Sequence, residues 1–208
     1  MDWLINLMSQ SLEGINSFVG NYGVSIIIFT VIVKLLLYPL SAKQARSMKD
    51  MQKLQPELKK IQEKYKDDKQ KQTEAMTGLY KEHGVNPAAG CFPMILTLII
   101  IWPLYRAIYG LNVDQTTFLW IQNLAKPDIA LVILNALAMV GQTYITTKLS
   151  GNNSQSNMIM YMMPLFLLFI GFQLPAGILI YWFTQTVLTG LQQYIINREP
   201  DTEGVAKE

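Results

Sequence analysis

The chain has 208 residues, half of them hydrophobic and only 15% charged, and its mean hydropathy is +0.21. Soluble domains carry about 25% charged residues, so this composition favours a chain that is mostly embedded in lipid. A formal net charge of +2 gives no indication of direct nucleic-acid recognition, and a single cysteine, Cys91, excludes an internal disulfide framework.

Residues 1–22 predict an amphipathic helix that lies in the plane of the membrane on its extracytoplasmic side. One face carries apolar side chains at helical spacing, after Trp3 at its start: Leu4, Met8, Leu12, Ile15 and Val19. The segment has no basic n-region and no small-residue cleavage site, so it is expected to remain in the mature protein. An ordinary core helix is the alternative, but so short a membrane chain offers little soluble core.

Five apolar stretches predict transmembrane helices, each of which needs about 20 residues. They cover residues 23–42, 90–110, 128–148, 158–173 and 174–196. The fourth is short for a full crossing, and Gly171 and Pro175 indicate a tight turn before the fifth. We therefore expect an all-α integral membrane protein, with an extracytoplasmic loop at 111–127, a cytoplasmic loop at 149–157 and a cytoplasmic tail at 197–208.

Lys34 lies near the middle of the first stretch, about 15 Å along a helix from Val24. A cation at that depth costs roughly 2.5 to 3.5 kcal/mol on insertion scales, so its ammonium is expected to face protein, water or a counter-ion. The alternative is a side chain that snorkels to the headgroups, but from mid-membrane its reach falls short. Lys34 is therefore the first candidate for a functional side chain.

Residues 43–89 predict a cytoplasmic helical hairpin. Apolar side chains recur at helical spacing in its first part (Met48, Met51, Leu54, Leu58, Ile61 and Tyr65) and in its second (Met76, Leu79 and Tyr80). A turn is expected at 66–70, and Pro56 is expected to bend or restart the first helix.

Lysine and arginine are concentrated in this hairpin, whereas the segment before the first span has neither. Because positively charged short loops stay in the cytoplasm, we expect the N-terminus outside and the C-terminus in the cytoplasm. The basic side chains either form a solvated face or contact anionic lipid, a ribosome or a targeting partner, and both interpretations remain open here.

Polar residues in three of the predicted spans line up on one helical face each. They are Thr30, Lys34 and Tyr38 in the first span, Asn135, Gln142 and Thr146 in the third, and Trp182, Gln185, Thr189 and Gln192 in the fifth. Three polar stripes predict a hydrophilic groove inside the membrane, with Lys34 as its only fixed charge near mid-depth. The alternative, for all but Lys34, is that they hold helices together through hydrogen bonds of about 0.6 kcal/mol each.

The residue inventory gives no support for an enzyme. His83, the only histidine, lies in the polar hairpin, and the chain has neither an HExxH zinc motif nor a GxxxxGK[ST] phosphate loop. We expect no catalytic residue, no cofactor and no metal. The competing interpretation is a small channel or transporter subunit with an anion-attracting cavity, which is disfavoured because five spans cannot divide into equal inverted repeats.

Several fragments, in this order and spacing, resemble the YidC/Oxa/Alb family of membrane protein insertases across nearly the whole chain. They lie at 25–40 (SIIIFTVIVKLLLYPL), 51–56 (MQKLQP), 80–87 (YKEHGVNP), 90–93 (GCFP), 104–108 (LYRAI), 175–182 (PAGILIYW) and 192–194 (QQY). The resemblance implies five helices around a positively charged groove that is closed to the outside and open to the cytoplasm and lipid. It also implies the compact, Gram-positive-like form and a bacterial plasma membrane.

The family pattern has an arginine at the position of Lys34, so the charge is kept here but the bidentate fork is lost. By the same resemblance Gln142 and Trp182 map to groove-lining positions, and residues 43–84 to a mobile element that receives substrate. The implied function is insertion of nascent membrane proteins, especially single- and double-spanning ones with short acidic outer segments. The implied partners are these substrates and membrane lipids, with the Sec translocon and the ribosome as further candidates, and no nucleotide or metal is implied.

Overall fold

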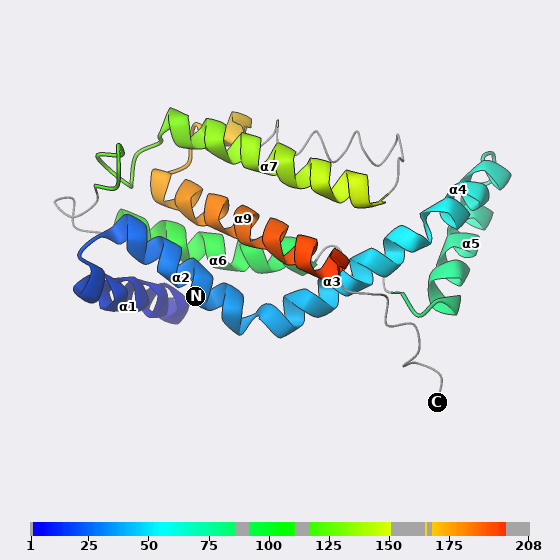
Figure 1. Ribbon diagram of the computed structural model, residues 1–208, viewed down its shortest axis with the longest axis horizontal. Coiled ribbons are helices and arrows are strands. Elements are labelled where there is room, and N and C mark those ends of the chain that lie inside the picture. The colour runs from blue at the N-terminus through cyan, green and yellow to red at the C-terminus, as the bar shows by residue number, and fades with distance from the viewer. Residues whose placement is uncertain (1, 86–91, 111–116, 151–164, 166–167, 199–208) are drawn as a thin grey trace.

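The computed structural model describes residues 2–85, 92–110, 117–150, 165 and 168–198, and this part of the chain is mostly helical. Its helices are α1 (Asp2–Val19), α2 (Tyr22–Leu36), α3 (Tyr38–Lys53), α4 (Gln55–Lys64), α5 (Lys69–Glu82), α6 (Phe92–Tyr109), α7 (Ile129–Ser150) and α9 (Ala176–Arg198). Figure 1 shows α2, α6, α7 and α9 running along the long axis, with α4 and α5 at the far end of α3. The expected all-α architecture is confirmed for these residues.

Several predicted segments fall wholly or partly outside the described residues. They are 86–89 of the hairpin, 90–91 of the second span, 111–116 of the extracytoplasmic loop, 151–157 of the second cytoplasmic loop, most of the fourth span, and 199–208 of the tail. By length and hydropathy, no single helix in the described ranges meets the requirements of a membrane span. The pair α1 and α2 meets them jointly, with a bend of 119° between the two helices, and shorter apolar helical segments lie at Ile99–Tyr109 and Ile129–Ile145.

The corner between α1 and α2 is built by Gly20 and Asn21. Gly20 has a φ of +68°, a left-handed conformation that glycine adopts without steric cost. Asn21 then caps α2, because its side-chain oxygen accepts a hydrogen bond from the Val24 backbone N–H at 3.2 Å. The corner lets α1 fold back, so that Met8 and Leu12 are buried in the same core as α2 and α6.

The main core lies where α2, α6 and α9 meet. Ile26, Leu104, Ile178 and Leu179 are fully buried there. Gly177 brings α9 close to its neighbours, since a Cβ at this position would lie 2.8 Å from Ile108 Cδ1. The close approach places the following turns of α9 beside α2, and these turns carry the polar residues discussed below.

The predicted first span is interrupted inside the apolar stretch. Helix α2 ends at Leu36, Leu37 is its C-cap, and α3 begins at Tyr38 and continues as far as Lys53. Pro39 accounts for the break, because proline has no backbone N–H and its ring clashes with the preceding turn of a helix. As a result, α3 joins the predicted end of the first span to the start of the predicted hairpin.

Helices α4 and α5 pack against each other around a small separate core. Leu54, Leu58 and Leu79 are buried in it. Pro56 lies in the first turn of α4, where its missing N–H costs no helical hydrogen bond. Tyr80 packs at the edge of this core, and its partial burial raises the pKa of the phenol.

The N-cap of α5 gives the hairpin a pH dependence. Asp68 accepts a hydrogen bond from the Lys71 backbone N–H at 3.1 Å, which with the Lys71 side chain lowers the pKa of its carboxyl. Because the pKa is lowered in the folded protein, the cap stabilises α5 at pH values above the pKa of an unfolded aspartate, about 3.9. This stabilisation is lost as the pH falls through the lower pKa of the folded state. We expect Asp68→Ala to speed amide hydrogen exchange in α5 at pH 7, and the difference from wild type to vanish at strongly acidic pH.

Asp68→Asn is the matched control, because an asparagine side chain still caps a helix but does not titrate. It should protect α5 almost as well as aspartate at pH 7 and keep that protection in acid. Equal exchange rates in wild type and Asp68→Ala at pH 7 would contradict a stabilising role for this cap.

Candidate functional site

A cavity of about 80 Å³ lies between the end of α2, α3, α6 and α9. Its polar lining comes mainly from two elements, α3 with Ser41 and Gln44, and α9 with Gln185, Thr189, Gln192 and Gln193. Lys34 of α2 and Thr97 of α6 complete the polar part, and Ile100 and Tyr181 are among the apolar residues that close it. We call this space the polar cavity.

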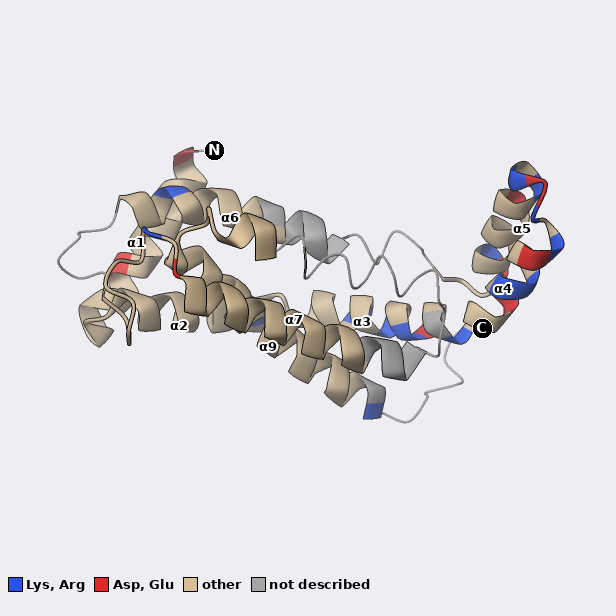
Figure 2. Ribbon diagram, turned by 90° about the horizontal axis from the view of Figure 1, so that it is seen from above, with Lys and Arg blue, Asp and Glu red and all other residues tan. Residues whose placement is uncertain are grey.

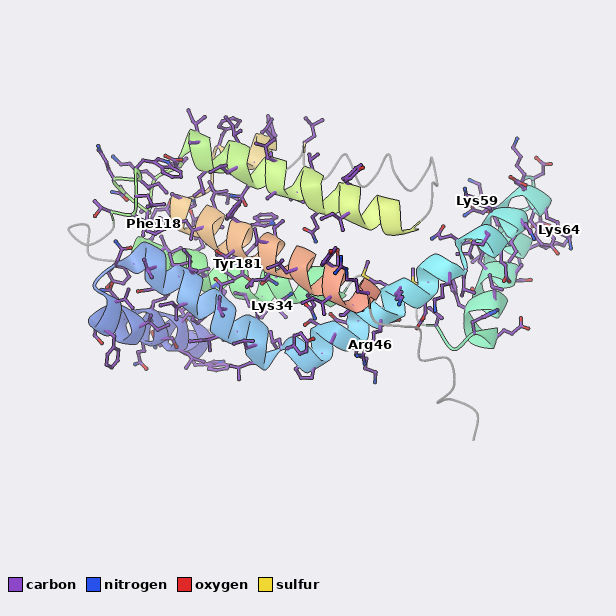
Figure 3. All side chains as sticks on the ribbon, viewed as in Figure 1. Lys34, Arg46, Lys59, Lys64, Phe118 and Tyr181 are labelled. Atoms are coloured by element: carbon purple, nitrogen blue, oxygen red, sulfur yellow. The ribbon has the colours of Figure 1, made fainter. Side chains whose placement is uncertain are left out.

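Lys34 reaches the polar cavity from the last turn of α2 (Figure 3). Its ammonium is partly buried and donates a hydrogen bond to Thr189 Oγ1 at 3.0 Å. Within the described part of the chain, no carboxylate forms an ion pair with it. The position in a C-terminal helical turn suits a cation, because the unpaired carbonyls of the turn carry partial negative charge. The structure therefore holds a positive charge against a polar helix face.

A second hydrogen bond ties the same helix face to α3. Gln192 Nε2 donates to Ser41 Oγ at 2.9 Å, and Ser41 Oγ donates in turn to the Tyr38 carbonyl at 3.1 Å. Residues 189 and 192 are three positions apart, so they lie on one side of α9. The Gln192–Ser41 bond contributes about 0.5 to 1.5 kcal/mol net, and the Lys34–Thr189 bond, whose donor is charged, about 1.5 to 3 kcal/mol, so both bonds help to hold this part of α9 against α2 and α3.

The structure brings four of the predicted groove residues together at the polar cavity: Lys34, Gln185, Thr189 and Gln192. Thr30 is buried instead, and its hydroxyl donates to the Ile26 carbonyl of its own helix at 2.6 Å. Tyr38 is 44% exposed on the first turn of α3, because the break at Leu37 separates it from α2. Trp182 is partly buried but is not part of the cavity lining.

The residues predicted on the third span lie on α7, and none of the described residues that line the polar cavity comes from that helix. Asn135 is fully buried between α7 and α9, where its amide donates to the carbonyls of Leu131 and Leu179 at 2.9 and 3.0 Å. Gln142 is partly buried elsewhere on α7, and the side chain of Thr146 lies outside the described ones.

Sequence reasoning missed the contributions of α3 and α6. Ser41, Gln44 and Met48 recur at three- and four-residue spacing, a signal that continues the stripe of α2 past the proline break. Gln44 and Met48 lie in the stretch predicted to be the cytoplasmic hairpin, whereas Ser41 lies in the last turn of the predicted first span. Thr97 was passed over because it is a single hydroxyl in an otherwise apolar stretch.

The charges of the molecule are segregated along its length. Figure 2 shows most of the lysine, arginine, aspartate and glutamate residues on α3, α4 and α5, with a few others on α1 and the loops near it, whereas α2, α6, α7 and α9 are largely uncharged. An uncharged bundle with a charged extension is the distribution expected when one part lies in hydrocarbon and the other in water.

Comparison with known proteins places the chain in a family. The model of the family described as 60Kd inner membrane protein matches residues 14–203. The chain is 38% identical over 208 residues to the membrane protein insertase YidC of Fusobacterium nucleatum, a match that covers 96% of this chain and 99% of that protein. It is 41% identical over 196 residues to the YidC insertase of Caldanaerobacter subterraneus, covering 94% of each.

Other relatives are much longer than this chain. The match to the YidC insertase of Syntrophus aciditrophicus has 38% identity over 204 residues and covers 96% of this chain but 37% of that protein. A crystal structure of an active YidC insertase with its first transmembrane domain resolved is similar with a TM-score of 0.77 and 31% identity, over 93% of this chain and 46% of that one. The resemblance seen in the sequence is thus confirmed, and the chain belongs to the 60Kd inner membrane protein family, that of the YidC membrane protein insertases.

Proposed function

We propose that the chain is a membrane protein insertase of a bacterial plasma membrane, which admits short acidic segments of nascent membrane proteins through the polar cavity. The observation that carries the proposal is the Lys34 ammonium, held in the cavity by Thr189 with no ion-pair partner among the described carboxylates. Two relatives that the chain matches over nearly their whole length are named membrane protein insertases, and this supports the insertase assignment.

The proposed topology has five spans, with α1 on the extracytoplasmic surface and α3 to α5 extending into the cytoplasm. The segregation of charge supports it, because the basic side chains gather on α3, α4 and α5. Exposed aromatic side chains of α1 and of the loop before α7 add support: Trp3 and Trp120 are 69% and 52% exposed, and tryptophan is enriched at membrane surfaces.

The mechanism follows from the cost of moving polar groups through hydrocarbon. An acidic segment enters lipid only at a cost of several kcal/mol, and a polar surface with a positive charge reduces that cost. The polar cavity offers such a surface within an otherwise apolar bundle. The apolar stretch of the substrate then partitions into lipid, and hydrophobic transfer drives its release. No nucleotide takes part in these steps.

The observed cavity has to widen to receive a peptide. At about 80 Å³ it has room for only a few water molecules. Widening moves the turns of α9 that carry Thr189 and Gln192 away from α2 and α3, which breaks the Lys34–Thr189 and Gln192–Ser41 hydrogen bonds while the core around Ile178 and Leu179 stays packed. Polar groups of the substrate replace both partners, so the exchange costs little net free energy.

The test is reconstitution of the purified chain into liposomes, followed by addition of a single-span substrate with an acidic outer segment. We expect the outer segment to become protected from external protease in the presence of the chain, without nucleotide, and to stay accessible with empty liposomes. Equal accessibility in both would contradict the proposal. A solute-dependent current through the reconstituted chain, without insertion, would favour a channel instead.

A further inference from the structure

A second, larger cavity of about 530 Å³ lies in the angle between α1 and α2, and Val33 is the one described residue that lines both this space and the polar cavity. Leu7, Gly14 and Phe18 line it from α1, and Phe29, Ile32 and Leu36 line it from α2. We call this space the α1–α2 groove. Its lining residues recur at helical spacing on each helix, so the groove follows one face of each.

The lining of the groove is suited to an apolar occupant rather than to water. Gln10 and Ser11 are its polar side chains, and the Ser11 hydroxyl already donates to the Leu7 carbonyl at 2.7 Å. An ordered water molecule needs two to four polar partners, which this lining does not provide along its length. Filling the groove with hydrocarbon removes apolar surface, while the Ser11 hydroxyl keeps its partner and the exposed Gln10 side chain remains accessible to water.

The volume of the α1–α2 groove distinguishes between two apolar occupants, a lipid acyl chain and a substrate helix. An engineered protein cavity of about 150 Å³ binds benzene, and on that scale the groove holds roughly 20 carbon atoms, room for one lipid acyl chain. A helix as long as residues 29–36 is about 12 Å long and at least about 10 Å across, so it fills roughly 900 Å³. The groove is therefore too small to contain a substrate helix, whereas it can contain one acyl chain.

The rim of the groove continues into surface that faces lipid in a protein of this family. Phe18, Leu36 and Ile32 are 92%, 73% and 44% exposed, although all three are apolar. We infer that the α1–α2 groove binds one acyl chain of a membrane phospholipid, drawn from the leaflet in which α1 lies. The bound chain fills the angle between the two helices and so supports the orientation of α1 on the membrane surface.

Gly14 allows the inference to be tested by blocking the groove. A Cβ at Gly14 would meet no atom within 4 Å, so Gly14→Ala leaves the groove open, whereas the large ring of Gly14→Trp occupies it. The full chain is reconstituted with a trace of phospholipid that carries a photoreactive acyl chain, extracted in detergent, illuminated and mapped by mass spectrometry. We expect label on residues 7–18 and 29–36 in wild type and Gly14→Ala, and a fall of at least about fivefold in Gly14→Trp.

The exposed face of α7 is the internal reference for labelling by bulk lipid. Leu137 and Tyr144 are 63% and 58% exposed there, so lipid that merely covers the surface labels them as readily as the groove. The inference is overturned if the groove residues and the exposed face of α7 are labelled to the same extent. It is also overturned if labelling of the groove is equal in Gly14→Trp and Gly14→Ala. Ile32→Trp blocks the groove from α2, and it serves as the second variant if Gly14→Trp does not fold.

Discussion

Replacing Lys34 by glutamate is expected to abolish insertion of a substrate with an acidic outer segment, and Lys34→Arg is expected to preserve it. Glutamate places a negative charge where the ammonium now lies, so attraction of the acidic segment becomes repulsion. Two unit charges 4 Å apart interact by about 4 kcal/mol at an effective dielectric constant near 20. Arginine keeps the positive charge and adds hydrogen-bond donors. Protease protection in proteoliposomes, at equal protein content, measures the effect.

Two further variants separate charge from other effects. Lys34→Gln removes the charge but keeps a donor for Thr189, and we expect insertion to slow at least about tenfold, which requires a loss of only about 1.4 kcal/mol in the transition state. Lys60→Gln removes the same charge from an exposed position on α4 and serves as the control. If all Lys34 variants insert the acidic substrate at the wild-type rate, the cavity acts through its polarity and the charge mechanism is wrong.

Gly23→Ala is expected to destabilise the fold by about 1 to 3 kcal/mol, a large effect for a single methyl group. The side chain of Phe118 covers the position that the new Cβ would occupy, and the atoms concerned include its own Cβ, which a rotamer change cannot move. Figure 3 shows Phe118 beside the start of α2. Thermal unfolding in detergent measures the loss.

The loop that carries Phe118 cannot yield easily, because it is anchored on both sides. Phe118 and Ile121 exchange two backbone hydrogen bonds of 2.8 Å, and the Asn21 side chain donates to the Thr117 carbonyl at 2.9 Å. Gly14→Ala is the matched control, since a Cβ there meets nothing and alanine favours a helix interior by up to about 1 kcal/mol. Equal melting temperatures for Gly23→Ala and Gly14→Ala would contradict the predicted clash.

The break at Leu37 shows how a local rule and a longer pattern compete. The apolar stretch from 23 to 42 predicts one span by its length alone, yet Pro39 is a strong local signal that a helix ends nearby. The same effect of proline predicts a helix boundary at Pro56, and α4 does begin at Gln55. The α2–α3 break was missed because hydropathy averages over many residues, whereas the effect of a proline on the backbone is confined to one turn.

Asn135 and Thr30 show why the groove could be predicted only in part. A polar side chain in an apolar helix needs a hydrogen-bond partner, and a wet groove, a neighbouring helix or its own helix can each supply one. Thr30 uses the carbonyl of Ile26, and Asn135 uses that of Leu179 on the adjacent helix. The Thr30 hydroxyl and the Asn135 amide nitrogen thus find their partners within the helix packing, and neither residue lies at the polar cavity.

The sequence by itself determined the helical class and the charged extension, and it predicted a functional role for Lys34. These follow from composition, periodicity and the cost of a cation in an apolar stretch, which depend on neighbours along the chain, whereas the family was indicated by the resemblance of its sequence fragments. Only the tertiary structure decided that Thr189 holds Lys34, that α3 and α6 line the polar cavity while α7 does not, and that α1 and α2 enclose an apolar groove. Such pairings depend on the rotation and crossing of helices, which arise from close packing at places such as Gly177 and are not encoded in the periodicity of any single helix.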